Sequence, residues 1–444
     1  MRVELLAFGL LFIVFSYPQF GCKETPPGPS SSTIELAVTD ASCTEAWLKV
    51  TLTDASEPRT VALKRDGQTV LSARLTTSDS VLIDEGLLPH HTYTYQALRL
   101  RDDGVAFSTS DAIQVTTLDT TSHDFTFQID TLGDGNGSVL YDVAIINDTL
   151  AYAVGEIYKR DSLGNWDPIF YNLAKWNGRE WTLQRLYYQG NTIMHLRWIL
   201  AFNERDIWVN SITHWNGVRW EEVAFDPIFY GVSTNKAWGT SSSDFYVVGN
   251  GGFIAHYDRV RWRRIESGTT IDLRDVWGSP DGSVVWAGGY TADYTRSILL
   301  QSSGQQWRRV IEIPLSVPPR ADSISGSIAS VWASMSRRAE VATSGGMYQV
   351  PLESNGNARR AWFPSIGTAG FFNRVRGKVL NNMFVVGDFG TVAHYSGVSW
   401  HQYTEFFNMS NPPSLRFWSV SVSDCLMLAV GTVGGRAFIV RGQR

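Results

Sequence analysis

The stretch His214-Trp215-Asn216-Gly217-Val218-Arg219-Trp220 contains an aromatic residue, a turn with glycine, and a tryptophan five residues after the first. This arrangement predicts a tight hairpin with a bulky anchor on each arm. The same pattern recurs along the chain, so the hairpin is part of a repeat. Its copies lie at residues 175–181, 256–262 and 394–400, with a more divergent one at 302–307.

A second element precedes each hairpin and consists of a strand, a short turn, and a strand that ends in Val-Gly or a related pair. The clearest copies, residues 235–251 and 273–289, align with each other. Together the two elements give four strands per roughly 40 residues, which predicts the blade of a β-propeller. Seven blades are expected, with six or eight left open. The units are anchored at Val143, Ile199, Ala237, Val276, Val331, Val375 and Val420.

The two ends of the repeat region predict how a propeller over residues 125–444 would close. The last unit stops after its third strand, near residues 437–441. The segment Phe125-Thr-Phe-Gln-Ile-Asp130 resembles a fourth strand such as Trp262-Arg-Arg-Ile-Glu. We therefore expect residues 125–130 to complete the last blade and remove its exposed edge.

The composition agrees with an all-β protein. The 444 residues include 13 % aromatic and only 18 % charged residues, with 39 glycines spread along the chain. Strands joined by tight turns need aromatic residues and spaced glycines. The net charge of −5, with signs interspersed, argues against binding to nucleic acid.

The N-terminus is expected to direct the chain out of the cytoplasm. Residues 5–15 form an apolar run of 11 residues, too short to span a bilayer but typical of a signal-peptide core. With Cys22 after Gly21, residues 1–22 resemble a bacterial lipoprotein signal, which implies lipidation of Cys22 and an acyl anchor. An ordinary secretory signal cleaved near Gly21 is the alternative. Residues 23–33, rich in Pro and Ser, are expected to form a tether.

Residues 34–120 alternate apolar and polar positions and predict a small sandwich of about seven strands. Leu87, Pro89 and Tyr93 resemble the fibronectin type III pattern, in which the tyrosine hydroxyl ties down a corner between strands. The resemblance implies a spacer domain. Cys43 and Cys425 fall in separate predicted domains and are expected to be lone buried thiols. No Cys/His spacing resembles a zinc site.

The repeat region resembles bacterial surface propellers with Val-Trp-Gly-Ser and His-Tyr-x-Gly-x-x-Trp repeats, neighbours of the BNR and sialidase-like folds. These motifs imply the fold and are silent on activity. The sialidase Asp-box is approached only by residues 279–286, where the glycine is displaced, and this segment is expected to be a turn.

No group of residues predicts catalysis. His214, His256 and His394 occupy one position of three repeats, so they should lie apart around a ring and make a repeated structural hydrogen bond. No carboxylate pair suits glycoside chemistry, and neither a G-x-S-x-G motif nor a phosphate loop is present. The sequence therefore predicts no enzyme, no cofactor and no metal.

A binding face can be predicted from loop lengths. The loops between the second and third strands share one rim with the links between blades, and some are long and rich in aromatic residues. Such rings suit stacking on sugars or gripping a protein loop; alternatively, they pack beneath their own loops. The candidate ligand-binding residues are Tyr158, Trp166, Tyr188, Tyr290 and Tyr294.

These observations favour a monomeric, non-enzymatic binding or scaffold protein. It would be lipid-anchored at the bacterial outer membrane or cell surface, and secreted or periplasmic if Cys22 is not lipidated. Its propeller would bind a glycan or a protein. The alternative is a surface hydrolase or lyase acting on polysaccharide in the propeller funnel, which would require acidic or histidine residues clustered there.

Overall fold

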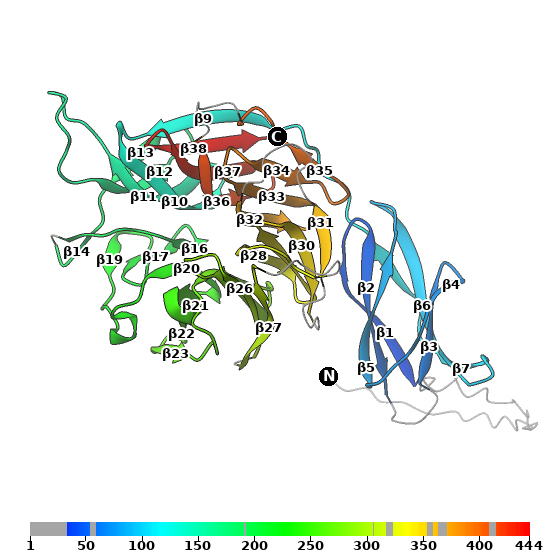
Figure 1. Ribbon diagram of the computed structural model, residues 1–444. Coiled ribbons are helices and arrows are strands. Elements are labelled where there is room, and N and C mark those ends of the chain that lie inside the picture. The colour runs from blue at the N-terminus through cyan, green and yellow to red at the C-terminus, as the bar shows by residue number, and fades with distance from the viewer. Residues whose placement is uncertain are drawn as a thin grey trace, which may run out of the picture. The chain divides into compact units, whose positions relative to one another are not determined.

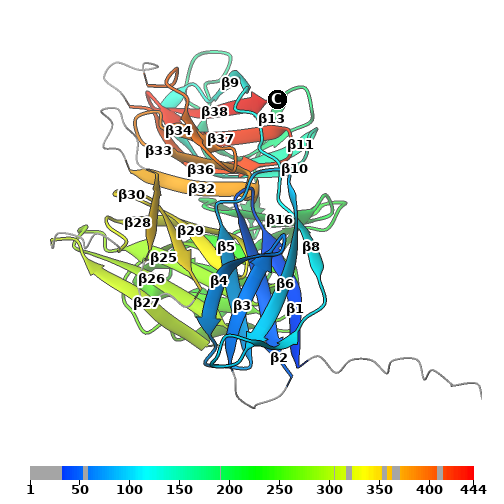
Figure 2. The same ribbon diagram turned by 90° about the vertical axis from the view of Figure 1, so that its right-hand side faces the viewer.

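The computed structural model describes residues 33–53, 59–190, 192–304, 306–316, 323–352, 358–362, 371–407 and 414–444. These residues form antiparallel strands almost throughout, as Figures 1 and 2 show, which confirms the predicted all-β class. The two helical turns are the 3-10 segments η1 (Pro227–Phe229) and η2 (Asn250–Gly252). Cys22 and the predicted signal sequence lie outside the described residues. Within those residues, no helix has the length and apolarity needed to cross a membrane.

The N-terminal strands form two sheets. A turn at Asp66-Gly67, with both residues at positive φ, joins β3 (Thr60–Arg65) to β4 (Gln68–Arg74). The predicted tyrosine contact is also present, because the Leu88 backbone N–H donates to the Tyr93 hydroxyl at 2.9 Å. One sheet has the order β1 (Ile34–Ala41), β2 (Glu45–Leu52), β5 (Asp79–Glu85); the other has the order β4 (Gln68–Arg74), β3 (Thr60–Arg65), β6 (Thr92–Leu100), β7 (Ala106–Thr109), with β8 (Ile113–Thr116) also on β6.

The repeat region contains seven antiparallel sheets of four strands among the described residues. Six of them use four strands that are consecutive in the chain, as the repeat predicts. In order they are β10 (Gly135–Asn147), β11 (Leu150–Tyr158), β12 (Tyr171–Trp176), β13 (Trp181–Gln184); β16 (Ile199–Asn203), β17 (Asp206–Val209), β18 (Thr213–Trp215), β19 (Trp220–Glu222); β20 (Thr234–Ser241), β21 (Asp244–Gly249), β22 (Ile254–Tyr257), β23 (Trp262–Ile265); β24 (Leu273–Gly278), β25 (Val284–Tyr290), β26 (Arg296–Ser303), β27 (Gln306–Pro314); β28 (Ile328–Met335), β29 (Arg338–Thr343), β30 (Gly346–Pro351), β31 (Arg359–Trp362); and β32 (Phe372–Val379), β33 (Asn382–Gly387), β34 (Val392–Tyr395), β35 (Trp400–Gln402).

The seventh sheet closes the ring as predicted. Its strands are β36 (Arg416–Val422), β37 (Leu426–Val433), β38 (Arg436–Gln443) and, from the other end of the repeat region, β9 (Thr126–Leu132). Val440 pairs with Ile129 in an antiparallel register. The first strands of the seven sheets also contact one another in a closed cycle, from β10 through β36 and back to β10. Between the first two sheets lies the small hairpin β14 (Tyr187–Tyr188) and β15 (Thr192–Ile193).

The recurring hairpin has the predicted geometry. In four copies the tryptophan lies directly opposite the earlier aromatic residue, as in Trp215 opposite Trp220 and Tyr395 opposite Trp400, whereas Trp307 of the divergent copy lies opposite Ser302. The turn needs a residue at positive φ, which glycine adopts without steric cost; Gly217 has φ +90. Apolar cores lie between successive sheets, for example Val154 and Leu173 of the first sheet against Ile207 and Val209 of the second.

The two cysteines among the described residues are free, as expected. Cys43 is buried. Cys425 is exposed, so the prediction that both thiols are buried was wrong for this residue. It sits in the turn between β36 and β37, where the repeat brings the chain to the surface.

Candidate functional site

A repeated β-bulge shapes the centre of the ring. In six of the seven sheets the pairing of the first and second strands skips a residue two positions before the predicted anchor. A bulge leaves the extra residue outside the ladder and redirects its side chain, and bulges are common beside functional sites. The bulged residues are Tyr141, Asn235, Arg274, Ala329, Asn373 and Trp418; in the remaining sheet Arg197 holds the same position, just before β16.

Glycine at the end of the second strand makes room for this bulge. A Cβ on Gly289 would lie 1.8 Å from the Asp272 carbonyl oxygen, and one on Gly431 would lie 1.9 Å from that of Arg416. Such distances exclude any side chain. The Val-Gly ending of the repeat is therefore explained by the close approach of the preceding backbone.

The seven residues at this position line one pocket of about 350 Å³, which is completed by Tyr290 and Arg374. Its wall therefore takes one residue from every sheet. Three of the lining residues are arginines, and none is acidic: Arg197, Arg274 and Arg374.

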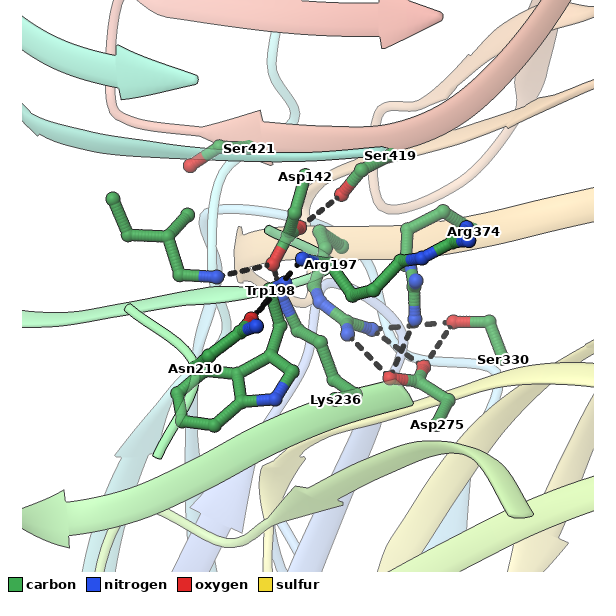
Figure 3. Close-up of polar contacts among 12 residues, drawn as sticks. Asp142, Arg197, Trp198, Asn210, Lys236, Asp275, Ser330, Arg374, Ser419 and Ser421 are labelled. Atoms are coloured by element: carbon green, nitrogen blue, oxygen red, sulfur yellow. Dashed lines mark hydrogen bonds and ion pairs between the residues drawn. The ribbon is translucent and has the colours of Figure 1, made fainter. Parts of the chain in front are cut away.

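One residue further along, the first strands supply a buried polar layer, whose hydrogen bonds and ion pairs Figure 3 shows. Asp275 is its first centre. Its carboxylate accepts from the Ser330 hydroxyl at 2.5 Å and the Val331 backbone N–H at 3.0 Å, and it pairs with Arg374 at 2.6 Å. Arg376 donates to both carboxylate oxygens, at 3.0 and 2.7 Å.

The environment of Asp275 holds it as a carboxylate. Burial alone would raise its pKa, but attraction to Arg374 and Arg376 outweighs the desolvation and lowers the pKa to about 2. The layer thus ties the fourth sheet to the fifth and sixth through one charged group.

Asp142 is the second centre of the layer. It accepts from the Ser419 hydroxyl at 2.6 Å and the Ile199 backbone N–H at 3.0 Å, and it pairs with Lys236. Burial lowers the pKa of Lys236 to about 8, partly offset by attraction to Asp142. The second centre joins the first, second, third and seventh sheets.

The charges of this layer do not cancel. Two carboxylates, Asp142 and Asp275, face three buried cations, Lys236, Arg374 and Arg376, which leaves one net positive charge. Arg374 is 8 % exposed; its Nη1 atom pairs with Asp275 at 2.6 Å, and its Nε atom has no hydrogen-bond partner among the described residues. Arg374 also lines the pocket.

A second pocket, of about 520 Å³, continues from the first. The two share Arg197, Asn235 and Arg274 in their walls. Apolar and polar side chains both line the second pocket, and again no acidic residue is among its described lining residues. Its apolar side chains are Met194, Ile212, Phe225, Phe229 and Val232. We call the two pockets together the arginine groove.

The five predicted binding residues lie in different surroundings in the structure. Tyr290 lines the arginine groove, and Tyr294 stacks on it with ring centroids 5.3 Å apart. Tyr158 packs on Phe170 at 5.4 Å, and Tyr188 lies in the β14–β15 hairpin. Trp166 is covered by Arg160 of its own loop, 4.1 Å from the ring centroid. The five residues therefore do not form one platform, and only Tyr290 belongs to the groove walls.

Sequence reasoning missed Arg197, Arg274 and Arg374. No local motif joins residues so far apart in the chain. The available signal was the register of the repeat, because the residue just before the anchor is polar in six of the seven units. Those residues are Asp142, Lys236, Asp275, Ser330, Arg374 and Ser419.

The histidines do what their repeated position predicts. His214 pairs with Asp206 at 2.8 Å, and His256 pairs with Asp244 at 2.6 Å, each within its own sheet. His394 contacts Asn382 at 3.2 Å in the equivalent place. Within the part of the chain that the structure describes, no group of three or more His, Cys, Asp or Glu residues could hold a metal ion.

The fold and the groove define a β-propeller with a central pocket. A solved structure titled YCF48 bound to D1 peptide is similar, with a TM-score of 0.53 and 13 % identity over 73 % of this chain and 98 % of that one. YCF48 from Cyanidioschyzon merolae follows at TM-score 0.48 and 12 % identity, covering 71 % of this chain and 98 % of the other. The extracellular domain of a one-component system from B. thetaiotaomicron follows at TM-score 0.45 and 14 % identity, covering 70 % and 39 %. No family model and no curated protein matches the sequence.

Proposed function

We propose that this protein is a non-enzymatic binding or scaffold protein whose propeller captures a protein or glycan in the arginine groove. The observation that carries the proposal is the repeated position two residues before each anchor, bulged in six of the seven sheets, from which every repeat contributes a residue to one pocket. Ligand sites are concave, partly apolar, and contain a few convergent polar groups, as this groove does. The similar propeller named above was solved with a peptide bound, which supports a binding role for this fold.

The alternative is an enzyme acting on polysaccharide. Such an enzyme needs a carboxylate acid and a carboxylate base or nucleophile on either side of the substrate. The two carboxylates of the buried layer, Asp142 and Asp275, are paired with Lys236, Arg374 and Arg376, and the carboxylates that contact groove-lining side chains, Asp272, Glu156 and Asp388, are bound to Arg274, His195 and Asn373. This arrangement favours binding.

A screen of glycans and candidate protein partners with the full chain tests the proposal. We expect capture of a ligand that a variant with Tyr290→Ala and Arg197→Gln no longer retains. Release of sugar products from a polysaccharide by the protein would instead support the enzyme.

The proposed setting is the cell surface. A lipidated Cys22 would carry the anchor, and the N-terminal sandwich, with its tyrosine contact and sheets of three and five strands, supports a fibronectin type III-like spacer. Because one residue would bear every acyl chain, Cys22→Ser should move the protein from the membrane fraction to the soluble fraction. An unchanged distribution of this variant would contradict the lipoprotein proposal.

A further inference from the structure

The arginine groove has unused positive charge. Arg197 is exposed and forms no ion pair with any described residue. Arg274 pairs with Asp272 at 3.0 Å and Arg374 pairs with Asp275 at 2.6 Å, and the Nε atom of each has no hydrogen-bond partner among the described residues. No acidic residue is among the described residues that line the two pockets, and the buried layer keeps one net positive charge, so the groove suits an anionic ligand.

The arrangement of the arginines suits a compact planar anion. Guanidinium groups bind carboxylates through paired hydrogen bonds, and such contacts are stronger where water is excluded. Here three arginines line one pocket of about 350 Å³ and do not form an open stripe, so they fit a single carboxylate better than a polyanion.

Three aromatic rings of the first pocket, those of Tyr141, Tyr290 and Trp418, each carry an arginine on one face. Arg197 lies 4.1 Å from the ring centroid of Tyr141, and Arg274 lies 5.0 Å from that of Tyr290. Arg416 similarly covers Trp418 at 4.9 Å. Sugars bind proteins largely by stacking on free ring faces, and these faces carry arginines instead. The groove therefore favours a peptide over a glycan.

The adjoining pocket supplies what the rest of a peptide needs. Ile212, Phe225 and Val232 provide apolar contacts, while the amides of Asn235 and Asn250 can meet backbone groups of an extended chain. A peptide seated by its carboxylate at the arginines could continue into this pocket, because the two spaces share walls.

We propose that the arginine groove binds an extended peptide by a carboxylate, held by Arg197, Arg274 and Arg374, with the neighbouring residues of the peptide in the pocket lined by Ile212, Phe225 and Val232. This inference rests on the proposed function and names the class of ligand. The carboxylate can come from the C-terminus of the peptide or from an Asp or Glu side chain.

Three pools of random decapeptides with an N-terminal dye distinguish these sources. One pool has a free C-terminus and no Asp or Glu, the second is amidated and contains Asp and Glu, and the third is amidated and contains neither. Immobilised full-chain protein should retain the first or second pool at least about tenfold more than the third. Retention of the first alone assigns the C-terminal carboxylate, and retention of the second alone assigns a side chain.

Variants test the assignment to these arginines. Arg197→Gln and Arg274→Gln should each reduce retention of the favoured pool about fivefold or more, without loss of the folded state. Arg374→Gln should do the same where its melting curve shows a folded protein. The matched control is Arg205→Gln, because Arg205 is 78 % exposed in the β16–β17 turn and lines neither pocket.

Two results would overturn the inference while leaving the proposed function intact. The first is equal retention of all three pools. The second is retention of acidic oligogalacturonides with no retention of any peptide pool. Failure to retain any pool or any glycan would contradict both.

Discussion

Arg376 and Asp275 form a two-pronged ion pair in the middle of the propeller, with Nη1 to Oδ2 at 3.0 Å and Nη2 to Oδ1 at 2.7 Å. The two residues come from the sixth and fourth sheets, and both are buried. Arg376 also donates to the backbone carbonyls of Val331 and Val375, so the pair joins three sheets. This ion pair belongs to the buried polar layer next to the arginine groove.

Removing the charge of Asp275 should destabilise the whole propeller. Asp275→Asn would leave Arg374 and Arg376 buried without their anion, which typically costs about 3–5 kcal/mol. Glu312→Gln is the control, since Glu312 pairs with Arg296 and Arg309 at the surface and such pairs contribute about 0–1 kcal/mol. Urea unfolding of both variants measures the difference. Equal stabilities would show that the pair does not support the ring.

The closing strand offers a second test. Phe127 of β9 packs on Tyr403 and Phe406 with ring centroids 4.8 and 5.1 Å apart, whereas Ile129 of the same strand is 45 % exposed. Phe127→Ala should cost about 3 kcal/mol through the cavity it leaves, and Ile129→Ala should change stability by less than about 1 kcal/mol. Thermal unfolding of the propeller should remain a single transition in the Phe127→Ala variant, at a lower melting temperature than in the parent. An additional transition at lower temperature, separate from the main one, would mean that closure affects only the last sheet.

The sequence predicted the fold well because the repeat is local. Four hairpins, from Trp176 and Trp181 to Tyr395 and Trp400, carry their own aromatic pair and turn, and the surplus strand before the first unit indicated the closure. The groove was harder to predict, because its side chains meet only when seven distant strands assemble. Loop length directed attention to Trp166 and Tyr294, whereas the bulges beside the central strands place Arg274 and Asn373 in the pocket.

Two histidines near the closing sheet, His123 and His394, lead us to expect that the protein is less stable in acid. Burial, with His123, Arg444 and His401 nearby, lowers the pKa of His394 to about 3, and burial also lowers the pKa of His123. Both groups are therefore held neutral in the folded state. Stability should be full above the unfolded pKa of about 6.5 and decrease as the pH falls toward 3, because the unfolded state binds protons that the folded state excludes.

Melting temperatures between pH 7 and pH 4 measure this effect. His394→Phe places an apolar ring beside Phe384 and Phe125, 4.7 and 5.3 Å from the present imidazole, and should flatten the pH dependence. The same slope in this variant and the parent would assign the acid sensitivity to other groups.

Substitution of Trp166 distinguishes a role in packing its own loop from a role in ligand binding. The ring is half-buried beneath Arg160 and lines neither pocket of the arginine groove. Trp166→Ala should therefore lower the free energy of unfolding by about 1–2 kcal/mol, through lost packing and a lost cation–π contact, and leave peptide retention unchanged. Retention lost without a change in melting temperature would restore Trp166 as a ligand-binding residue.

Hydrogen exchange with bound peptide locates the binding site on the propeller. The full chain is compared with and without the decapeptide that it retains most strongly from the pools described above. We expect slower amide exchange at residues 272–275 and 371–374, beside the bulges that carry Arg274 and Asn373, with residues 158–170 unchanged. Protection confined to 158–170 and 291–296, with none beside the bulges, would contradict the account and move the binding site to the outer loops.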